Sequence, residues 1–445
     1  MTAERRSGAT EQAAEIAAGS LRSLDLVRGY LDRIAAEGEA VRAWAYLDPE
    51  YALRQAQERD DQRGLGRPLG PLHGVPVGLK DIIDTADMPT ENGTPLDAGR
   101  RPRQDATLVS RLRGAGAVIM GKTVSTELAF YAPGKTHNPH DPNRTPGGSS
   151  SGSAAAVAAG QVPLAVGTQT NGSVIRPASF CGVVGYKPSH GTISRKGLLS
   201  QSPPLDTVGV FAQSVEDAAL LVDVIAGHDP ADSATRPMAH PRLLEAARSA
   251  PPVKPSFALV KGPTWDAADA DTKDGLAELS DFLGDACDEV PLPSAFDRAH
   301  DLQRLLMMAG FAKNLAPYYE KGRDQLSDVM RAAIEEGRRV LAVDYALAEE
   351  WIDVLNGGLA EIFERYDAIL TPSAVGEAPE GLDATGDPTF CTLWTLCGTP
   401  AITLPLLQGS SGLPIGVQMV AGRGDDARLL RSARWLMDEL AKAKG

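Results

Sequence analysis

Apolar residues recur along the chain with two different periods, and this predicts helices interleaved with strands. Residues 20–36 have the spacing of an amphipathic helix. Its predicted apolar face comprises Leu24, Val27, Leu31 and Ile34. Over residues 75–79 every second position is apolar, which is the period of a strand, and turn residues flank the segment. The N-terminal part of the chain therefore predicts a helix followed by a strand.

The alternation continues toward the C-terminus. Residues 105–113 are predicted to form a helix capped by Asp105, and the apolar segment 115–123 to form the next strand. A helix over 214–226 is expected to be capped by Ser214. Further strands are predicted at 256–260, 367–373, 400–405 and 414–421.

Helices that alternate with strands in this way favour the α/β fold class. We expect one large α/β/α domain over residues 1–445, with a central mixed β-sheet covered by helices. Its core would be residues 70–215, and residues 236–365 would form a more variable helical elaboration. The Pro-rich segment 236–255 is expected to be a surface connection, and a division into two domains there is the alternative.

Composition excludes several classes of function. The 445 residues include 58 acidic and 44 basic side chains, a net charge of −14, whereas nucleic-acid binding needs clustered basic residues. Arg5 and Arg6 are not followed by the apolar run of a signal peptide, and no segment approaches the roughly 18 apolar residues of a membrane span. The four cysteines form no CxxC pair, so neither a disulfide framework nor a zinc site is expected. We expect a soluble cytoplasmic protein without nucleic-acid or membrane partners.

A Gly/Ser-rich loop at 145–156 is the first candidate for chemistry. Its Gly148–Gly152 segment fits G-x-S-x-G, which would make Ser150 the nucleophile of a Ser-His-Asp hydrolase. However, a proline-led loop stands where that motif needs an apolar strand. The lysine of a phosphate-binding loop is also absent, because Ser153 occupies its position. A flexible loop that caps the small-residue helix after it is the structural alternative.

Lys80 is the second candidate, because it interrupts an apolar segment. A lone lysine in such a place most often reaches solvent or pairs with a carboxylate, here Asp81 or Asp84. The functional alternative is that desolvation lowers its pKa, so that the neutral amine can accept a proton.

The third candidate is the turn "GTQTNGS" at 167–173, which follows the apolar run 162–166. Asn171-Gly172 is a common hairpin signal. Alternatively, the turn exposes the Ser173 hydroxyl beside successive backbone N–H groups, which is the geometry of an oxyanion hole.

Taken in order, the segments "GPLHGVPVGLKD", "PGGSSSGSAAAVAAG", "VPLAVGTQTNGS" and "PASFCGVVGYKPS" resemble the amidase signature family. The matched region runs from about residue 72 to about residue 209. The resemblance implies an amidase, a hydrolase that acts on carbon–nitrogen bonds of linear amides rather than on peptide bonds. It implies no metal and no organic cofactor.

The resemblance also implies a Ser–Ser–Lys triad. Ser173 stands at the family's nucleophile position, Ser149 at that of a serine with a cis peptide bond, and Lys80 at that of the base. Lys80 would take a proton through Ser149 from Ser173, which attacks an amide carbonyl and forms an acyl-enzyme. The implied oxyanion hole comprises the backbone N–H groups of Thr170, Asn171, Gly172 and Ser173.

The nucleophile turn departs from the family's common form, D-T-G-G-S-I-R-x-P. Gln169 replaces the aspartate, Asn171 replaces a glycine, and Ile175 occupies the arginine position, with the arginine moved to Arg176. Because the nucleophile and the proline keep their spacing, we expect catalysis to be retained and the substrate network to differ.

The favoured function is a stand-alone amidase that hydrolyses a small-molecule carboxamide, or a related C–N carbonyl bond, to a carboxylic acid and ammonia or an amine. One alternative is a component of a glutamine-dependent amidotransferase that resembles its A-type subunit, which the altered turn disfavours. The other is a non-catalytic ligand-binding or scaffold protein of the same fold, against which the intact triad argues. The family often forms homodimers, and a homodimer is expected here. No substrate-binding residue is assigned, although Tyr131, Phe390 and Trp394 are candidates for the pocket wall.

Overall fold

The computed structural model describes residues 7–444. Arg5 and Arg6, on which the expectation about the N-terminus partly rests, lie outside the described residues. None of the helices between residues 7 and 444 combines the length and apolar character needed to span a bilayer.

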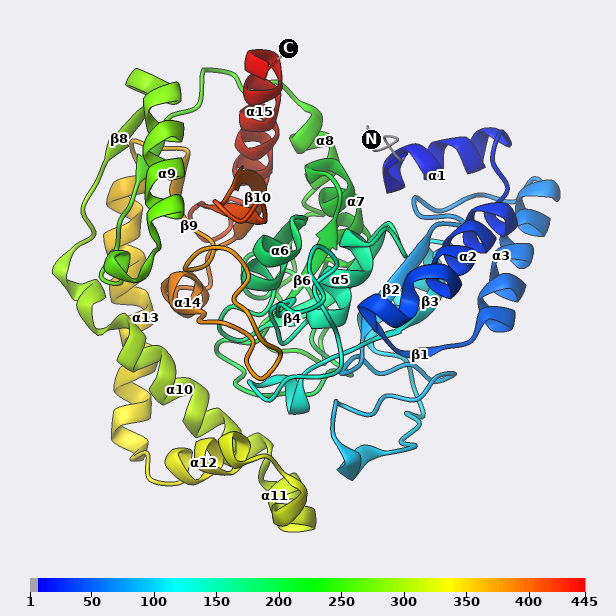
Figure 1. Ribbon diagram of the computed structural model, residues 1–445, viewed down its shortest axis with the longest axis horizontal. Coiled ribbons are helices and arrows are strands. Elements are labelled where there is room, and N and C mark those ends of the chain that lie inside the picture. Colours follow the sequence, from blue (N-terminus) through cyan, green and yellow to red (C-terminus); the bar gives the residue numbers. More distant parts are fainter. Residues whose placement is uncertain (1–6, 445) are drawn as a thin grey trace.

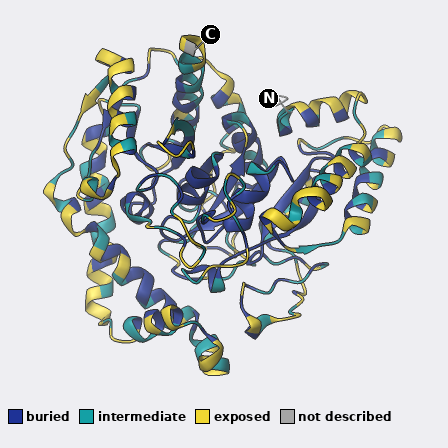
Figure 2. Cartoon of the chain, viewed as in Figure 1, coloured by how far each residue is buried: buried dark blue, intermediate teal, exposed yellow. Residues whose placement is uncertain are grey.

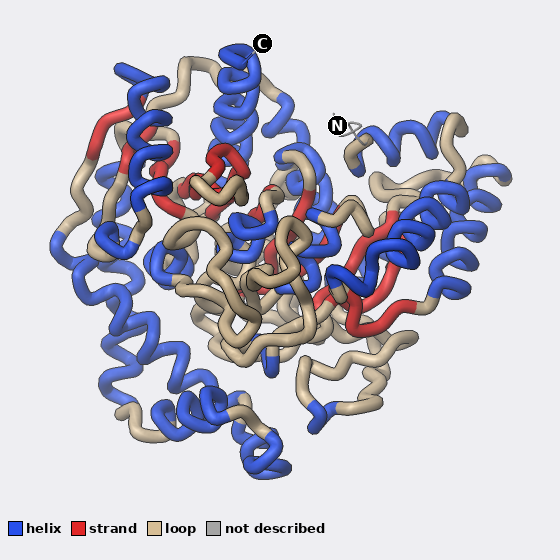
Figure 3. Tube along the Cα trace, viewed as in Figure 1, coloured by secondary structure: helices blue, strands red, loops and turns tan. Residues whose placement is uncertain are grey.

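One mixed sheet of eleven strands runs through the molecule (Figures 1 and 3). In their order across the sheet, the strands are β1 (Trp44–Leu47), β3 (Val118–Thr123), β2 (Pro76–Lys80), β4 (Leu164–Gln169), β6 (Thr207–Ala212), β5 (Val184–Lys187), β10 (Ala401–Gln408), β11 (Pro414–Val420), β9 (Ala368–Pro372), β7 (Phe257–Leu259) and β8 (Cys287–Glu289). Strand β2 is parallel to β3 and β4, and β7 is parallel to β8 and β9. The remaining pairs are antiparallel. The predicted α/β class with a mixed sheet is confirmed.

Helices cover both faces of this sheet. Within the described chain they are α1 (Ala9–Ala18), α2 (Ser23–Val41), α3 (Pro49–Gly64), α4 (Thr107–Gly114), α5 (Ser151–Ala158), α6 (Ile175–Cys181), α7 (Val215–Ile225), α8 (Leu243–Arg248), α9 (Ala270–Leu283), α10 (Ala299–Asn314), α11 (Ala316–Gly322), α12 (Asp328–Gly337), α13 (Ala342–Phe363), α14 (Thr389–Leu396) and α15 (Asp426–Lys444). Along β3, Val118 and Met120 join the core under α2, α3 and α5, whereas Ile119 joins the core under α4 and α7. Because successive strand residues point to opposite faces, these two cores lie on opposite sides of the sheet.

The deepest part of the molecule is the centre of the sheet with helices α5 and α6, whereas the outer faces of the peripheral helices are exposed (Figure 2). Every residue of β2, β3 and β4 is buried. The alternating pattern that predicted a strand at 75–79 therefore does not mark a half-exposed strand. Strand β2 is an interior parallel strand, which is covered on both faces.

Most predicted elements are present, with two corrections. The predicted cap of α4 is wrong: the helix begins after Ala106, and Asp105 instead accepts hydrogen bonds from the Ala86 N–H and the Arg113 side chain. These tertiary partners compete with the helix terminus for the same carboxylate. The predicted connection at 236–255 is interrupted by α8, since its apolar residues Leu243 and Ala247 are buried in the core. The expected Ser214 cap is confirmed.

Candidate active site

Lys80 is the last residue of β2, and its side chain is 0% exposed. Its Nζ donates to Ser149 Oγ at 2.7 Å and to Thr168 Oγ1 at 2.9 Å. The ion-paired alternative is wrong, because no ion pair among the described residues includes Lys80, and its sequence neighbour Asp81 is paired with Lys122. Lys80 is therefore buried, and its hydrogen-bond partners among the described residues are two hydroxyl groups.

Burial lowers the pKa of Lys80 well below its usual value of 10.5, because the low-dielectric interior disfavours the charged form. The charge of Asp206 opposes this shift, but burial also raises the pKa of that carboxyl group. A neutral Lys80 has a lone pair that can accept the hydroxyl proton of Ser149. The lowered pKa of a buried amine beside Ser149 is the property that a base at this position would need.

The loop that carries Ser149 lies against the start of α6. Gly147 has φ +81°, and a Cβ added to it would lie 2.7 Å from Pro177 Cα. The Gly148–Ser149 peptide bond is cis. Because Pro177 is in the first turn of α6, this close packing brings the Ser149 loop beside the turn that precedes the helix.

Ser150 is held inside the core and does not fit a nucleophile. Its Oγ donates to the Thr168 carbonyl and accepts from the Thr168 N–H, both at 3.2 Å, and the side chain is fully buried. These hydrogen bonds use the hydroxyl as a bridge between the loop and β4. The hydrolase alternative through Ser150 is therefore not supported by the geometry.

The segment after β4 is a strand-to-helix turn and not a hairpin. Strand β4 ends at Gln169, and α6 begins at Ile175. Ser173 is partly exposed, and within residues 7–444 no group forms a hydrogen bond with its hydroxyl. Among hydrogen bonds outside helices and strands in the described chain, none uses the N–H groups of Thr170, Asn171, Gly172 or Ser173 as donors. The turn therefore offers a hydroxyl beside available backbone donors.

The two unusual residues of this turn fix its conformation. Gln169 Oε1 accepts from the N–H groups of Val174 at 2.8 Å and Ile175 at 3.0 Å. Asn171 Nδ2 donates to Tyr131 Oη at 3.3 Å. The turn is therefore still held by hydrogen bonds. Its partners are the neutral side-chain amides of Gln169, where the family pattern has a carboxylate, and of Asn171, where it has a glycine.

Helix α14 supports the turn from the C-terminal part of the chain. Thr392 Oγ1 donates to Asn171 Oδ1 at 2.8 Å, and Thr395 Oγ1 donates to the Asn171 carbonyl at 2.5 Å. Gln169 Nε2 donates to Thr395 Oγ1 at 2.9 Å. Sequence reasoning missed both threonines, because nothing in the local pattern links residues more than 200 positions apart.

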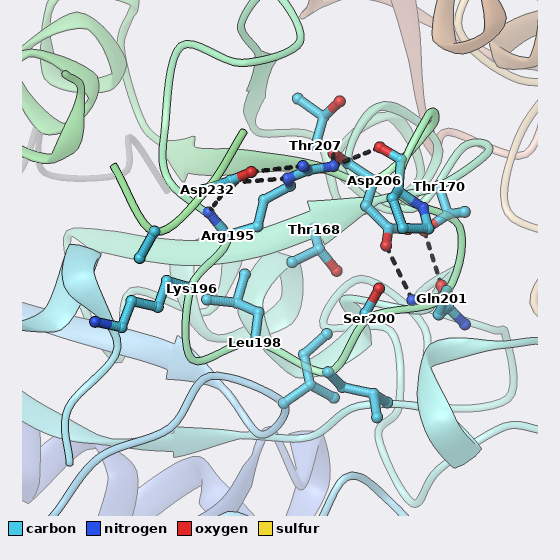
Figure 4. A pocket seen from close by; sticks show the side chains of 14 residues that line it. Thr168, Thr170, Arg195, Lys196, Leu198, Ser200, Gln201, Asp206, Thr207 and Asp232 are labelled. Carbon is cyan, nitrogen blue, oxygen red and sulfur yellow. Dashed lines mark hydrogen bonds and ion pairs between the residues drawn. The ribbon is translucent and has the colours of Figure 1, made fainter. Parts of the chain in front are cut away.

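A cavity of about 170 Å³ adjoins the Thr168 side of the lysine (Figure 4). Thr170 Oγ1, at its wall, lies 2.7 Å from Asp206 Oδ1 and 2.8 Å from Gln201 Oε1. The ion pair between Arg195 and Asp232 closes another side. Lys80 is not among the lining residues, so the cavity reaches it only through Thr168.

The three aromatic candidates for the pocket wall occupy different environments. Tyr131 contacts the nucleophile turn through Asn171. Phe390 and Trp394 lie on α14 and are buried, Trp394 within the core that α14 shares with α10. Only Tyr131 therefore lies beside the candidate site by a direct contact.

The described residues contain no group of three or more His, Cys, Asp or Glu side chains arranged to hold a metal ion. Cys181, Cys391 and Cys397 are buried free thiols, and Cys287 is a partly exposed one. The His73 and His140 rings each contact a backbone carbonyl oxygen, that of Arg59 and of Cys181.

Comparison with known proteins shows the family of the chain. The Amidase family model matches residues 25–430, and the chain belongs to this family. A curated relative is the A subunit of the glutamyl-tRNA(Gln) amidotransferase of Streptomyces coelicolor, which is 37% identical over 468 residues covering 95% of this chain and 94% of the relative.

Two solved structures extend the comparison to the fold. The peptide amidase PAM, solved with the competitive inhibitor chymostatin, superposes with a TM-score of 0.85 and 30% identity, covering 98% of each chain. A chain from a vestigial protein complex, which reveals the evolutionary origins of an s-triazine catabolic enzyme, superposes with a TM-score of 0.89 and 27% identity. That match covers 97% of this chain and 98% of the other. The family match and the structurally similar peptide amidase together support an enzyme that hydrolyses carbon–nitrogen bonds.

Proposed function

We propose that the chain is an amidase that hydrolyses small-molecule carboxamides through Lys80, Ser149 and Ser173. The observation that carries the proposal is the fully buried Lys80, which is hydrogen-bonded to Ser149 Oγ at 2.7 Å and has no carboxylate partner among the described residues. Burying a charged amine without a carboxylate partner is unfavourable in free energy, whereas a buried neutral amine can accept a proton.

In the first half of the reaction, neutral Lys80 accepts the proton of Ser149, and Ser149 in turn accepts the proton of Ser173. The Ser173 oxygen attacks the amide carbonyl and forms a tetrahedral intermediate. The proton then returns through Ser149 to the leaving nitrogen, the C–N bond breaks, and the acyl group stays on Ser173 as an ester.

The N–H groups of the turn Thr170–Ser173 would stabilise the negative oxygen of this intermediate. Removing one donor of such a hole typically costs about 10²–10³ in rate. In the second half, Ser149 and Lys80 take a proton from water, which attacks the ester carbonyl. The bond from that carbon to the Ser173 oxygen breaks, the proton returns through Ser149 to Ser173, and the carboxylic acid is released. No step needs a histidine.

The test is labelling with a fluorophosphonate probe, followed by intact-mass and peptide-mapping analysis. We expect one adduct on Ser173, its loss in Lys80→Ala, and its retention in the matched variant Ser150→Ala. In parallel, Ser173→Ala should retain the fold by circular dichroism and release no ammonia from amides. An adduct on Ser150, or full activity in Ser173→Ala, would overturn the proposal.

A second candidate function is a component of an amidotransferase built from several different chains, and the name of the Streptomyces coelicolor relative favours it. Such a chain would hydrolyse glutamine efficiently only with its partners. Purification from the native host, with mass determination in solution, separates the candidates. A stable complex with other chains favours the second, whereas a homodimer active on its own favours the first.

A further inference from the structure

One wall of the cavity beside Thr168 carries three polar side chains, those of Thr170, Gln201 and Asp206 (Figure 4). Thr170 follows the last residue of β4, and Asp206 precedes the first residue of β6. The Thr170 hydroxyl lies 2.8 Å from Gln201 Oε1 and 2.7 Å from Asp206 Oδ1. The Gln201 amide is oriented by its Nε2, which donates to the Leu128 carbonyl at 2.7 Å. Two acceptor oxygens therefore face one hydroxyl group.

This arrangement is one proton short if Asp206 is ionised. A threonine hydroxyl has a single proton to donate, and a carboxylate can only accept. If the Thr170 proton points to Asp206, no proton lies between Thr170 Oγ1 and Gln201 Oε1, although these oxygens are 2.8 Å apart. Exchanging the nitrogen and oxygen of the Gln201 amide only moves the deficit, because Oε1 would then face the Leu128 carbonyl. An ionised Asp206 therefore leaves two acceptor oxygens in contact, which is unfavourable in free energy.

A protonated Asp206 completes the hydrogen bonds. Its Oδ1–H donates to Thr170 Oγ1, and the Thr170 proton then points to Gln201 Oε1. The other carboxyl oxygen, Oδ2, accepts from the N–H groups of Gln201 at 2.9 Å and Ser202 at 3.0 Å. Each of these contacts then joins a donor to an acceptor. Burial also favours the protonated form, because it is the largest influence on the pKa of Asp206 and raises it.

The charged groups around Asp206 do not require a carboxylate there. Arg195 faces Asp206 and lowers the pKa of its carboxyl group, but the guanidinium is already paired with Asp232 at 2.7 and 2.9 Å. His190, 3.3 Å from Arg195 Nη1, is largely neutral at neutral pH, because burial lowers its pKa to about 4. Lys196 lines the same cavity but is exposed. The cation nearest to Asp206 on this wall thus already has its anion.

The proton on Asp206 affects two parts of the proposed catalytic machinery. Thr170 supplies one N–H group of the proposed oxyanion hole, and Gln303 Nε2 donates to its carbonyl at 3.1 Å. The hydrogen bond from Asp206 therefore anchors the side chain of a residue whose backbone belongs to the nucleophile turn. An ionised Asp206 would also raise the pKa of Lys80 and favour its charged form, which cannot accept a proton.

We propose that Asp206 is a positioning residue that acts as a neutral carboxylic acid: it anchors Thr170 in the nucleophile turn and keeps a negative charge away from Lys80. The inference rests on the proposed amidase function, to which it adds a second group that must hold a proton. The cavity of about 170 Å³ has room for water, so Asp206 can exchange this proton with solvent. At high pH, loss of the proton removes the donor to Thr170, and the rate should fall.

The first experiment compares the pH dependence of kcat/KM in Asp206→Asn and Asp206→Leu. The asparagine amide can donate to Thr170 and accept from the two backbone N–H groups, so it imitates the acid. Asp206→Asn should retain kcat/KM within about tenfold, leave the acid limb set by Lys80 in place, and remove the fall at high pH. Leucine is similar in size but has no donor, and it should lower kcat by about 100-fold, the cost of a misplaced group.

Two outcomes of this comparison would overturn the proposal. If Asp206 is ionised in the active protein, Asp206→Asn removes a negative charge that acts on Lys80 and should move the acid limb to lower pH by about one unit. Equal losses of kcat in the asparagine and leucine variants would show that the turn needs the carboxylate and not the acid.

Thr170 provides a second test, which does not depend on the folding of Asp206→Leu. Thr170→Val removes the hydroxyl between the two acceptors and keeps the backbone N–H, so kcat should fall as in Asp206→Leu, with a smaller change in KM. Thr170→Ser restores the hydroxyl and should recover most of the rate. A Thr170→Val protein with the kcat of the unmodified chain would show that these hydrogen bonds do not position the turn, and the proposal would be wrong.

Infrared spectroscopy separates this inference from the proposed function, because it needs no substrate. The carbonyl band of a protonated carboxyl group should be present in the unmodified protein at neutral pH and absent from Asp206→Asn. Asp232→Asn is the matched control on the same cavity. Against the effect of burial, hydrogen bonds with Arg195 lower the pKa of Asp232 to about 2, so this substitution should leave the band in place.

The two readouts can fail independently. The band without any amide hydrolysis would support the neutral acid and refute the amidase. Hydrolysis that depends on Ser173, without the band, would retain the amidase and refute the neutral acid.

Discussion

Two buried lysines on neighbouring strands have different surroundings. Lys80 is at the end of β2, opposite Thr123 of β3, and Lys122 is the residue before Thr123. Both side chains are 0% exposed. Lys122 Nζ donates to the Ile83 carbonyl at 2.5 Å and to Thr90 Oγ1 at 2.6 Å. It also lies 3.8 Å from Asp81 Oδ1, whereas Lys80 has only hydroxyl partners.

The comparison shows that burial alone does not determine what a lysine does. Burial lowers the pKa of Lys122, and the carboxylate of Asp81 limits that shift. Burial lowers the pKa of Lys80 well below 10.5, because desolvation outweighs the opposing charge of Asp206. Lys122 therefore joins structural elements through an ion pair, and Lys80 is the lysine whose surroundings fit the proposed role in proton transfer.

The largest expected effect comes from replacing each lysine by methionine. Lys80→Met should lower kcat/KM for amides by about 10³-fold or more, because it removes the general base. It should leave the melting temperature unchanged or raised, because it also removes a desolvated amine. Activity assays and calorimetry on the same samples measure both effects.

Lys122→Met should lower stability and leave the activity of the folded protein unchanged. It leaves Asp81 buried without its cation, which costs about 3–5 kcal/mol of folding free energy, while the folded fraction keeps its activity. Lys122→Met/Asp81→Asn should recover part of the loss in a denaturant titration. A folded Lys122→Met protein that hydrolyses no amide would contradict the division of roles.

The next largest effect is a difference in activity between alanine variants of two adjacent serines, Ser149 and Ser150. Ser149→Ala should lower kcat/KM by about 10²–10⁴-fold, since it interrupts proton transfer between Lys80 and Ser173. Ser150→Ala removes hydrogen bonds to Thr168 and should cost about 1 kcal/mol of stability with little loss of rate. Equal losses of activity in the two variants would show that Ser149 acts only through the shape of the loop.

The pH profile should report the lowered pKa of Lys80. Only the neutral amine is active, so kcat/KM should rise from acid to a plateau with a midpoint well below 10.5. The folded state binds fewer protons than the unfolded state between the two pKa values, so this lysine makes stability rise with pH there. A midpoint near 10.5 in hydrolysis assays would contradict the assignment of Lys80 as the base.

Thr168→Val should have the smallest effect. The Thr168 hydroxyl accepts a hydrogen bond from Lys80 and so favours its charged form. Its removal should move the acid limb of the profile to lower pH by about one unit, the size of one charged hydrogen bond. Plateau activity should change by no more than about tenfold. A shift to higher pH would mean that Thr168 stabilises the neutral amine.

Much of this arrangement could be predicted from the sequence, because it is local. The order of helices and strands follows from hydrophobic periods within short windows, and Lys80, Ser149 and Ser173 lie in distinctive segments. The absence of an ion pair at Lys80 among the described residues could only be offered as one of two alternatives, because the sequence does not show whether Asp81 pairs with it or with Lys122.

The missed features depend on long-range packing. The Asp105 carboxylate resembles a helix cap in sequence, but the folded chain supplies other donors. The support of the turn by Thr392 and Thr395 depends on the packing of α14 against the N-terminal half, and the contact of Arg176 with Thr385 depends on the residues just before that helix. No periodicity or local motif contains that information.

The support from α14 has a consequence for how the protein is made. All three proposed catalytic residues leave the ribosome before half of the chain has been synthesised, but the hydroxyls that hold Asn171 follow more than 200 residues later. A nascent or truncated chain that ends before Thr389 would carry the reactive serine in a turn without its support. Any hydrolytic competence that depends on this turn should therefore emerge only late in translation, once α14 has been synthesised.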